Sequence, residues 1–172
     1  MCYNNVYILI GYIIILFQKK EVNILIVTFF GHSNTPQSAE IDLENTIIDL
    51  IEKQFADTFY VGTHGNFDTY ANNILKKISK KYPNIKHFTV LAYMPQTNEL
   101  PNNFSNTILP ESVAKSHPKY AISKRNDWML DKSDIIITYI THQYGGAAKY
   151  YNKALRQNKK VINIANKKAV EL

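Results

Sequence analysis

The chain contains little of several residue types, and each shortage excludes a class of protein. Among its 172 residues there is one cysteine, Cys2, which excludes an intramolecular disulfide framework and suits a reducing, cytoplasmic compartment. The longest apolar run, over residues 6–17, falls short of the roughly twenty residues that a membrane-spanning helix needs. The sequence shows no internal repeat and no low-complexity tract. It therefore has the composition of a single cytoplasmic globular domain, and a membrane partner is not expected.

Residues 1–22 are interpreted apart from the rest. Lys19 and Lys20 follow the apolar run, whereas a signal peptide carries basic residues before such a run and a small-residue cleavage site after it. Residues 20–22 can be back-translated as AAG-GAG-GTN, which contains a ribosome-binding sequence of the bacterial type. Leu25, read as TTG, would then be the start codon. We expect a misread leader here; the alternative is a short membrane-associating segment.

From residue 23 to 167, strand-like and helix-like spacings of apolar residues alternate. Strands are expected at about 23–30, 58–62, 86–93, 134–140 and 160–165. Helices are expected at about 39–55 with Ser38 as N-cap, from Asp68 to before Pro83, at about 123–132 and at about 146–158. This alternation predicts an α/β fold: a single Rossmann-like three-layer domain with a mainly parallel sheet and helices on both faces. Residues 168–172 are then a tail.

Residues 94–119 interrupt the alternation. They contain four of the six prolines and little periodicity. A loop of this length inside a compact domain is usually functional or disordered. We interpret it as a cover over a site at the strand ends, with disorder as the alternative.

Three short loops rich in glycine and histidine each follow an expected strand and precede a helix. They cover residues 31–34, 62–66 and 141–146. In a parallel sheet such loops meet at one edge, where helix N-termini offer free N–H groups and a partial positive charge. The pattern predicts a site for a phosphate-bearing ligand.

Individual side chains in these loops allow more than one interpretation. Asp68 can cap a helix, hold a ribose hydroxyl, or do both, because a carboxylate has two acceptor oxygens. His32, His64 and His142 could form a three-histidine zinc site. No HxH or HExxH spacing and no nearby cysteine supports a metal, so contact with ligand phosphate or loop backbone is favoured. Tyrosines on the last loop and helix can stack on a base or pack on the sheet; they are Tyr144, Tyr150 and Tyr151.

Sequence motifs in the second half of the chain are more specific than these single side chains. SKRNDWM at 123–129, SDIIITY at 133–139, GGAA at 145–148 and VINI at 161–164 form one ordered string, and FFGH at 29–32 and VGTHGNFD at 61–68 precede it. The string resembles the SLOG superfamily of Rossmann-like domains, which includes the LOG phosphoribohydrolases and DNA-processing protein A. Its small, uncharacterised YpsA-like branch is the closest resemblance.

The resemblance implies a nucleotide site and can be followed position by position. LOG enzymes carry an arginine four residues before a methionine, as Arg125 and Met129 do here, and then a PGGxGTxxE loop. The glycine pair survives as Gly145 and Gly146, but the glutamate position is Asn152, and an amide cannot act as an acid or base. The ligand-binding residues that we expect are Gly31, His32, Ser33, Gly62, His64, Gly65, Asp68, Arg125, Asn126, His142, Gly145, Gly146 and Ala147.

Three functions follow from these observations. The first is a sensing or regulatory domain that binds a nucleotide or nucleotide-derived ligand, requires no further cofactor and is not an enzyme. The second is a nucleotide-processing hydrolase of LOG type in which Asp68 or Glu111 replaces the lost glutamate. The third is single-stranded nucleic-acid binding, which the modest, scattered net charge of +6 permits but does not favour. Members of the superfamily commonly pair, so a homodimer is a further expectation.

Overall fold

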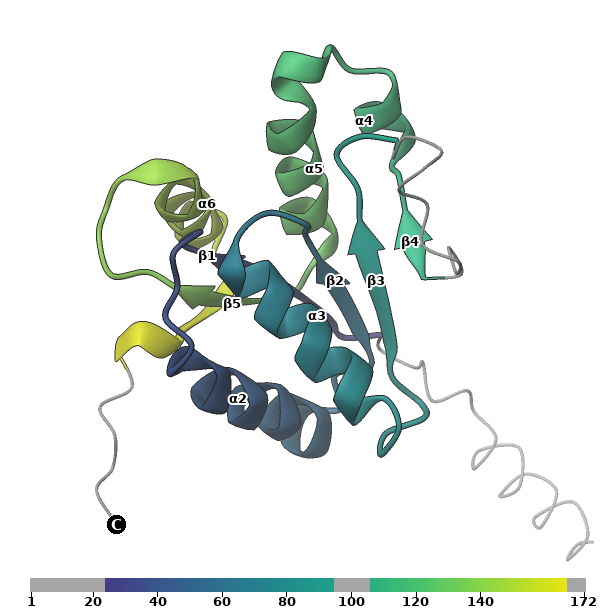
Figure 1. Cartoon of the computed structure of the whole chain (residues 1–172), viewed down its shortest axis with the longest axis vertical. Helices are drawn as coiled ribbons and strands as arrows, with labels where there is room; N and C mark the ends of the chain where they lie inside the picture. Colours follow the sequence, from purple (N-terminus) through teal and green to yellow (C-terminus); the bar gives the residue numbers. More distant parts are fainter. Residues whose placement is uncertain (1–23, 95–105, 167–172) are drawn as a thin grey trace, which may run out of the picture.

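The computed structural model describes residues 24–94 and 106–166 (Figure 1). The expected leader over 1–22, the tail over 168–172 and residues 95–105 of the proline-rich segment lie outside the described residues. Within the described ranges, every helix is too short or too polar to cross a bilayer.

Six strands form one sheet in which every pairing is parallel. In sheet order they are β4 (Thr107–Ile108), β3 (Lys86–Val90), β2 (Thr58–Val61), β1 (Ile26–Gly31), β5 (Ile135–Tyr139) and β6 (Lys160–Asn163). After β1 the chain proceeds outward on one side as far as β4, and it then returns to place β5 on the other side of β1. The order therefore reverses between β1 and β5, where ligands bind in open α/β sheets.

Helices cover both faces of this sheet, so the predicted α/β fold class is confirmed (Figure 1). Helices α2 (Ala39–Gln54) and α3 (Asn66–Ile78) pack on one face, and α5 (Pro118–Lys132) and α6 (Gly145–Arg156) pack on the other. Alternate strand residues face opposite ways. Phe29 and Ile137 belong to the α2/α3 core, whereas Phe30 and Ile136 belong to the α5/α6 core.

Two elements of the proline-rich segment were not predicted. β4 extends the sheet beyond β3, and the short helix α4 (Glu111–Ala114) follows it and packs on α5. β4 has only two residues, which is too short for a periodic pattern to be recognised. The described part of this segment therefore adds a strand at the edge of the sheet and a helix whose Val113 packs with Ala92, just beyond β3. The expected cover falls partly on residues 95–105, outside the described residues.

Two helix starts differ from the expectation. α5 begins at Pro118, five residues early, because proline fits the first helical position and His117 accepts a hydrogen bond from the Lys119 N–H (3.2 Å). α3 begins at Asn66 with Gly65 as its N-cap, so Asp68 lies inside the first turn and is not the cap residue. Ser38 is the N-cap residue of α2 as expected, although its side chain makes no capping hydrogen bond.

A short 3-10 helix, η2 (Ile164–Asn166), follows β6 where the last strand had been expected to continue to residue 165. The remaining strand and helix bounds agree with the expected ones within a few residues. The three glycine- and histidine-containing loops consequently leave the carboxyl ends of β1, β2 and β5.

Candidate ligand-binding site

A cavity of about 590 Å³ lies at the carboxyl ends of β1, β2 and β5. A volume of this size suits a small organic ligand. Every residue of the predicted binding set lines it except Gly65. The residues that line it in addition are Phe29, Phe30, Asn34, Ile122, Met129 and Tyr144.

Gly65 does not line the cavity but shapes the packing of the loops that do. Its φ of +90° and ψ of 171° belong to a region that only glycine adopts readily. A Cβ at this position would lie 2.6 Å from Ser33 Cα, and the next residue, Asn66, donates its backbone N–H to the Ser33 carbonyl at 2.9 Å. Gly65 therefore allows the loop after β2 to pack directly against the loop after β1. Ser33 and Asn34 of the loop after β1 line the cavity.

Arg125 and Asp68 form the buried end of the cavity. Their exposed fractions are 2% and 8%. A Cβ on Gly62 would come within 2.2 Å of both Arg125 Nη1 and Asp68 Oδ2, so Gly62 leaves the space that the two charged groups occupy. The alternative of a surface arginine paired with Asp127 or Asp131 is excluded, because Arg125 is buried and Asp127 pairs with Lys153.

The hydrogen bonds of Arg125 leave part of its guanidinium unused. Nη1 donates to the Val90 carbonyl at 3.3 Å, and Nη2 lies 3.4 Å from Nδ1 of His64. The buried Nε has no hydrogen-bond partner among the residues that the structure describes. Burial lowers the pKa of Arg125 and the Asp68 carboxylate raises it; arginine nevertheless remains protonated in proteins. This end of the cavity therefore holds a fixed cation whose donors are not all satisfied.

Asp68 has an altered acidity. Burial raises the pKa of its carboxyl group to about 6, although the Arg125 charge and the His64 N–H, which donates to Asp68 Oδ2 at 2.9 Å, both act to lower it. Burial and Arg125 in turn lower the pKa of His64, so its ring is neutral at pH 7. Asp68 can thus change its charge close to neutral pH, and Arg125 is the cation beside it.

The opposite end of the cavity is the N-terminus of α6. Gly145 has a φ of +89°, and Tyr144, the N-cap residue, makes no side-chain capping bond. Beyond its chain neighbours and its own helix backbone, a Cβ built on Gly145 or Gly146 would meet no heavy atom of the described residues within 4 Å. Packing therefore does not explain why residue 146 is a glycine, and the first-turn N–H groups have no partner inside the helix.

Three aromatic rings line this end. His32, 6% exposed, stacks on His142 with ring centroids 3.6 Å apart, and His142 stacks on Tyr144 at 3.8 Å. His64 lies instead against Arg125. Within the described ranges, no three histidine, cysteine or acidic side chains are placed to hold a metal ion.

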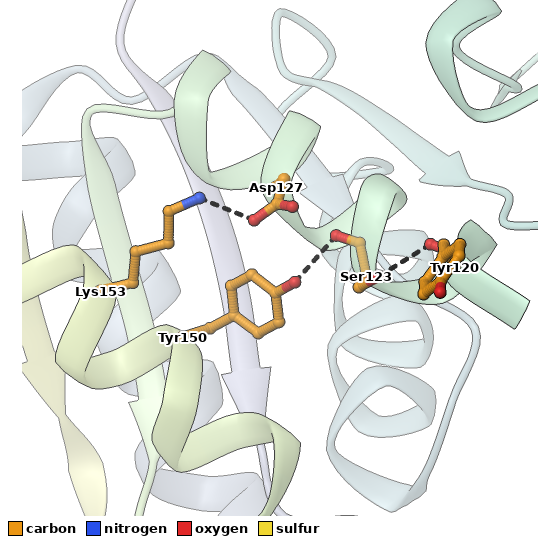
Figure 2. Close-up of polar contacts among 5 residues, drawn as sticks. All are labelled: Tyr120, Ser123, Asp127, Tyr150 and Lys153. Atoms are coloured by element: carbon orange, nitrogen blue, oxygen red, sulfur yellow. Dashed lines mark hydrogen bonds and ion pairs between the residues drawn. The ribbon is translucent and has the colours of Figure 1, made fainter. Parts of the chain in front are cut away.

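Two polar contacts connect helices α5 and α6 beside the cavity. Figure 2 shows the Tyr150 hydroxyl donating to the Ser123 carbonyl (2.8 Å) and Lys153 pairing with Asp127 (2.7 Å). The Tyr150 ring is buried and stacks on Phe30, which confirms that one of the two helical tyrosines packs on the sheet. These contacts fix the helix that carries Arg125 relative to the one that begins with the glycine pair.

Other candidates lie away from the cavity. Asn152, at the LOG glutamate position, does not line it, and its side-chain amide lies 3.4 Å from Gln143 Oε1. Glu111 lies on helix α4 with an exposed side chain, which pairs with Lys115. Glu111 therefore cannot replace the lost glutamate at this site.

Some residues that line the cavity were not predicted from the sequence. Ile122 and Met129 share the helix of Arg125 and line the cavity, and neither was in the expected ligand-binding set. Met129 also belongs to the core, because it is buried among Phe30 and Leu130. Their spacing of three and four residues from Arg125 was a signal that they share its helix face.

Comparisons with known proteins agree with the fold. No protein-family profile matches the chain, and no curated protein matches it. The X-ray structure of DNA processing protein A from Streptococcus pneumoniae is similar, with a TM-score of 0.59 and 14% sequence identity. The likeness covers 80% of this chain and 49% of that protein, so the chain spans about half of its structural neighbour. At this identity the likeness establishes a Rossmann-like fold shared with that protein, as the SLOG resemblance implied.

Proposed function

We propose that this chain binds a nucleotide or nucleotide-derived ligand, with a phosphate and a ribose, in the cavity at the strand ends. We further propose that it acts as a sensor or regulator in the cytoplasm and belongs to the YpsA-like branch. One observation carries the proposal: the unpacked Gly146 at the start of α6 opens onto the same cavity as the buried Arg125.

The two ends suit an anion for independent reasons. At the start of α6, unpaired backbone N–H groups and the helix dipole favour negative charge, and the glycines let a phosphate approach the backbone closely. At the other end, Arg125 has a buried donor without a partner. A phosphate can bind the first group, and Arg125 can contact a second phosphate or another electron-rich group of the same ligand.

Asp68 suits a sugar hydroxyl. Its carboxylate lines the cavity and already accepts the His64 N–H through Oδ2. A ribose hydroxyl can donate to the carboxylate, which would favour the ionised form. Binding without turnover is favoured because the LOG glutamate position is an asparagine outside the cavity.

Gly146→Ala tests the proposal. The new methyl group has room in the protein, so the variant should fold and gain about 0.5 kcal/mol from better helix propensity. It should nevertheless lose at least tenfold in affinity, because the methyl group occupies the path of the phosphate to the N–H groups. Calorimetric titration with AMP, ADP and ADP-ribose measures the loss.

Lys149→Ala is the matched control, because it removes a positive charge from the same helix at a side chain that does not line the cavity. It should retain most of the affinity. Absence of binding by any nucleotide at millimolar concentration, or equal binding by the wild type and Gly146→Ala, would refute the proposal.

A second candidate is single-stranded nucleic-acid binding, which the likeness to DNA processing protein A favours. An oligonucleotide would then bind with an affinity that falls steeply as salt rises. Fluorescence anisotropy with a labelled oligonucleotide, with AMP as competitor, distinguishes the two functions. Displacement by AMP would place both ligands in the same cavity, whereas AMP binding without any oligonucleotide binding would leave the nucleotide proposal alone.

Two expectations from the resemblance remain proposals. Hydrolysis of nucleoside monophosphates would require Asp68 as the acid or base, and release of free base that Arg125→Ala abolishes would support it. A homodimer would appear as twice the chain mass in sedimentation velocity.

A further inference from the structure

The three-ring stack ends in an aromatic face on which no other ring of residues 24–94 or 106–166 is stacked. His32 lies at the buried end, His142 in the middle and Tyr144 at the outside. The rings are nearly parallel, with interplanar angles of 18° and 16°. Tyr144 is 73% exposed although His142 covers one of its faces, so its other face is open.

The stack is anchored to the backbone at two levels. The N–H of Thr141 donates to His32 Nε2 at 3.2 Å, and His142 Nδ1 lies 3.1 Å from the Tyr144 carbonyl oxygen. Burial and the neighbouring His142 also lower the pKa of His32, so its ring is neutral at pH 8 and can accept the Thr141 hydrogen bond. An exposed tyrosine usually samples several rotamers, whereas this one rests on a fixed support, and a ligand would lose less entropy in stacking on it.

The position of the open face matches the proposed phosphate site. Tyr144 is the N-cap residue of α6 and lines the cavity together with Gly145 and Gly146. A planar group on its outer face would lie next to the N–H groups that suit a phosphate. Nucleotides carry such a planar group, and stacking of a base on an aromatic side chain depends little on which base it is.

We infer that the outer face of Tyr144, supported by His142 and His32, is the stacking platform for the base of the bound nucleotide. This inference rests on the proposed function. It assigns the base to the open rim of the cavity, beside α6, and leaves the buried end at Arg125 and Asp68 for the polar part of the ligand.

The platform has consequences for specificity. It favours ligands that retain a base over sugar phosphates that lack one, and it discriminates little between purine and pyrimidine beyond their stacking strength. The two histidines act as positioning residues, because they hold Tyr144 and lie beneath it in the stack.

The test compares AMP with ribose 5-phosphate, which share the phosphate and sugar and differ only in the base. Calorimetric titration of the full chain at pH 8 should give an affinity for AMP about five- to hundredfold above that for ribose 5-phosphate. Tyr144→Ala should reduce this ratio to about one, and Tyr144→Phe should retain it. His142→Ala should lower the ratio, whereas His142→Phe, which keeps a ring in the middle of the stack, should restore it.

A spectroscopic readout separates stacking from a general structural role. In the wild-type complex the proton resonances of the adenine ring should shift upfield, and Tyr144→Ala should abolish the shift. Equal wild-type affinities for the two probes, or an unchanged ratio in Tyr144→Ala, would overturn the platform alone. If neither probe binds the wild type, the proposed nucleotide site fails and the platform fails with it.

Discussion

The two ends of the cavity use glycine for different reasons. At the β1 and β2 end, a Cβ on Gly31, Gly62 or Gly65 would lie 2.2 to 2.6 Å from a neighbouring atom, so the fold itself requires these glycines. At the α6 end, a Cβ on Gly145 or Gly146 would meet nothing within 4 Å. Gly145 is still explained by its φ of +89°, but neither packing nor a positive φ explains Gly146. The comparison separates glycines that the protein needs from one that a ligand would need.

Gly62→Ala should have the largest effect. The added methyl group overlaps both Arg125 Nη1 and Asp68 Oδ2, and one of these buried charged groups must move. We expect a loss of about 3 kcal/mol in the free energy of unfolding, because the change overpacks the core and displaces a buried charged group. Urea denaturation measures it, with Gly146→Ala as the matched substitution that should stabilise slightly. Equal stability changes in the two variants would contradict the distinction between the two ends.

The packed end should also respond to pH through Asp68. Its pKa of about 6 in the folded chain lies above the unfolded value of 3.8, so the folded state binds the proton more tightly. Stability from this group is therefore present at about pH 4 and is lost as the pH rises through about 6. Relative to Asp68→Asn, which cannot titrate, the wild type should lose on the order of 2 to 3 kcal/mol between pH 4 and pH 7. A constant difference between the two proteins across this range would show that folding does not raise the pKa of Asp68.

Gly65→Ala and Gly145→Ala form a pair of substitutions at closely similar positive φ. Their φ values are +90° and +89°, so strain from a side chain at positive φ is common to both. Only Gly65 faces the Ser33 backbone at 2.6 Å. We expect a loss of about 2 kcal/mol for Gly65→Ala and about 1 kcal/mol for Gly145→Ala, and thermal denaturation of both measures the difference. Losses of equal size would mean that contact with Ser33 contributes nothing.

Much of the architecture was predictable because it depends on local patterns. Apolar periodicity located most strands and helices, and parallel topology then brought the three loops to one edge. The residues that line the site could be predicted on that basis, but the role of each residue could not. For Asp68 a helix cap and a contact with a ribose hydroxyl were both left open; Gly65 takes the cap position, and the Asp68 carboxylate is buried near the charge of Arg125.

The features that escaped prediction depend on long-range contacts or very short elements. The stacking of His32 on His142 joins residues more than a hundred positions apart, and no spacing rule reports such a contact. β4 has two residues and gives no periodic signal. The start of α5 could have been predicted, because Pro118 after His117 is a recognisable first-turn signal. It was missed because the apolar and polar residues of this helix are poorly separated into two faces.

The smallest effect should come from the connection between the helices that frame the two ends. Tyr150→Phe removes the hydroxyl that donates to the Ser123 carbonyl but keeps the buried ring on Phe30. Because the carbonyl loses a partner in a half-buried place, we expect a loss of about 1 kcal/mol. Tyr151→Phe makes the same chemical change one residue along the helix, on a half-buried side chain, and serves as the control in chemical denaturation. If Tyr150→Phe also weakens AMP binding severalfold while Tyr151→Phe does not, the hydrogen bond fixes the distance between Arg125 and Gly146. Unchanged affinity would mean that the Lys153–Asp127 pair and core packing hold the two helices without it.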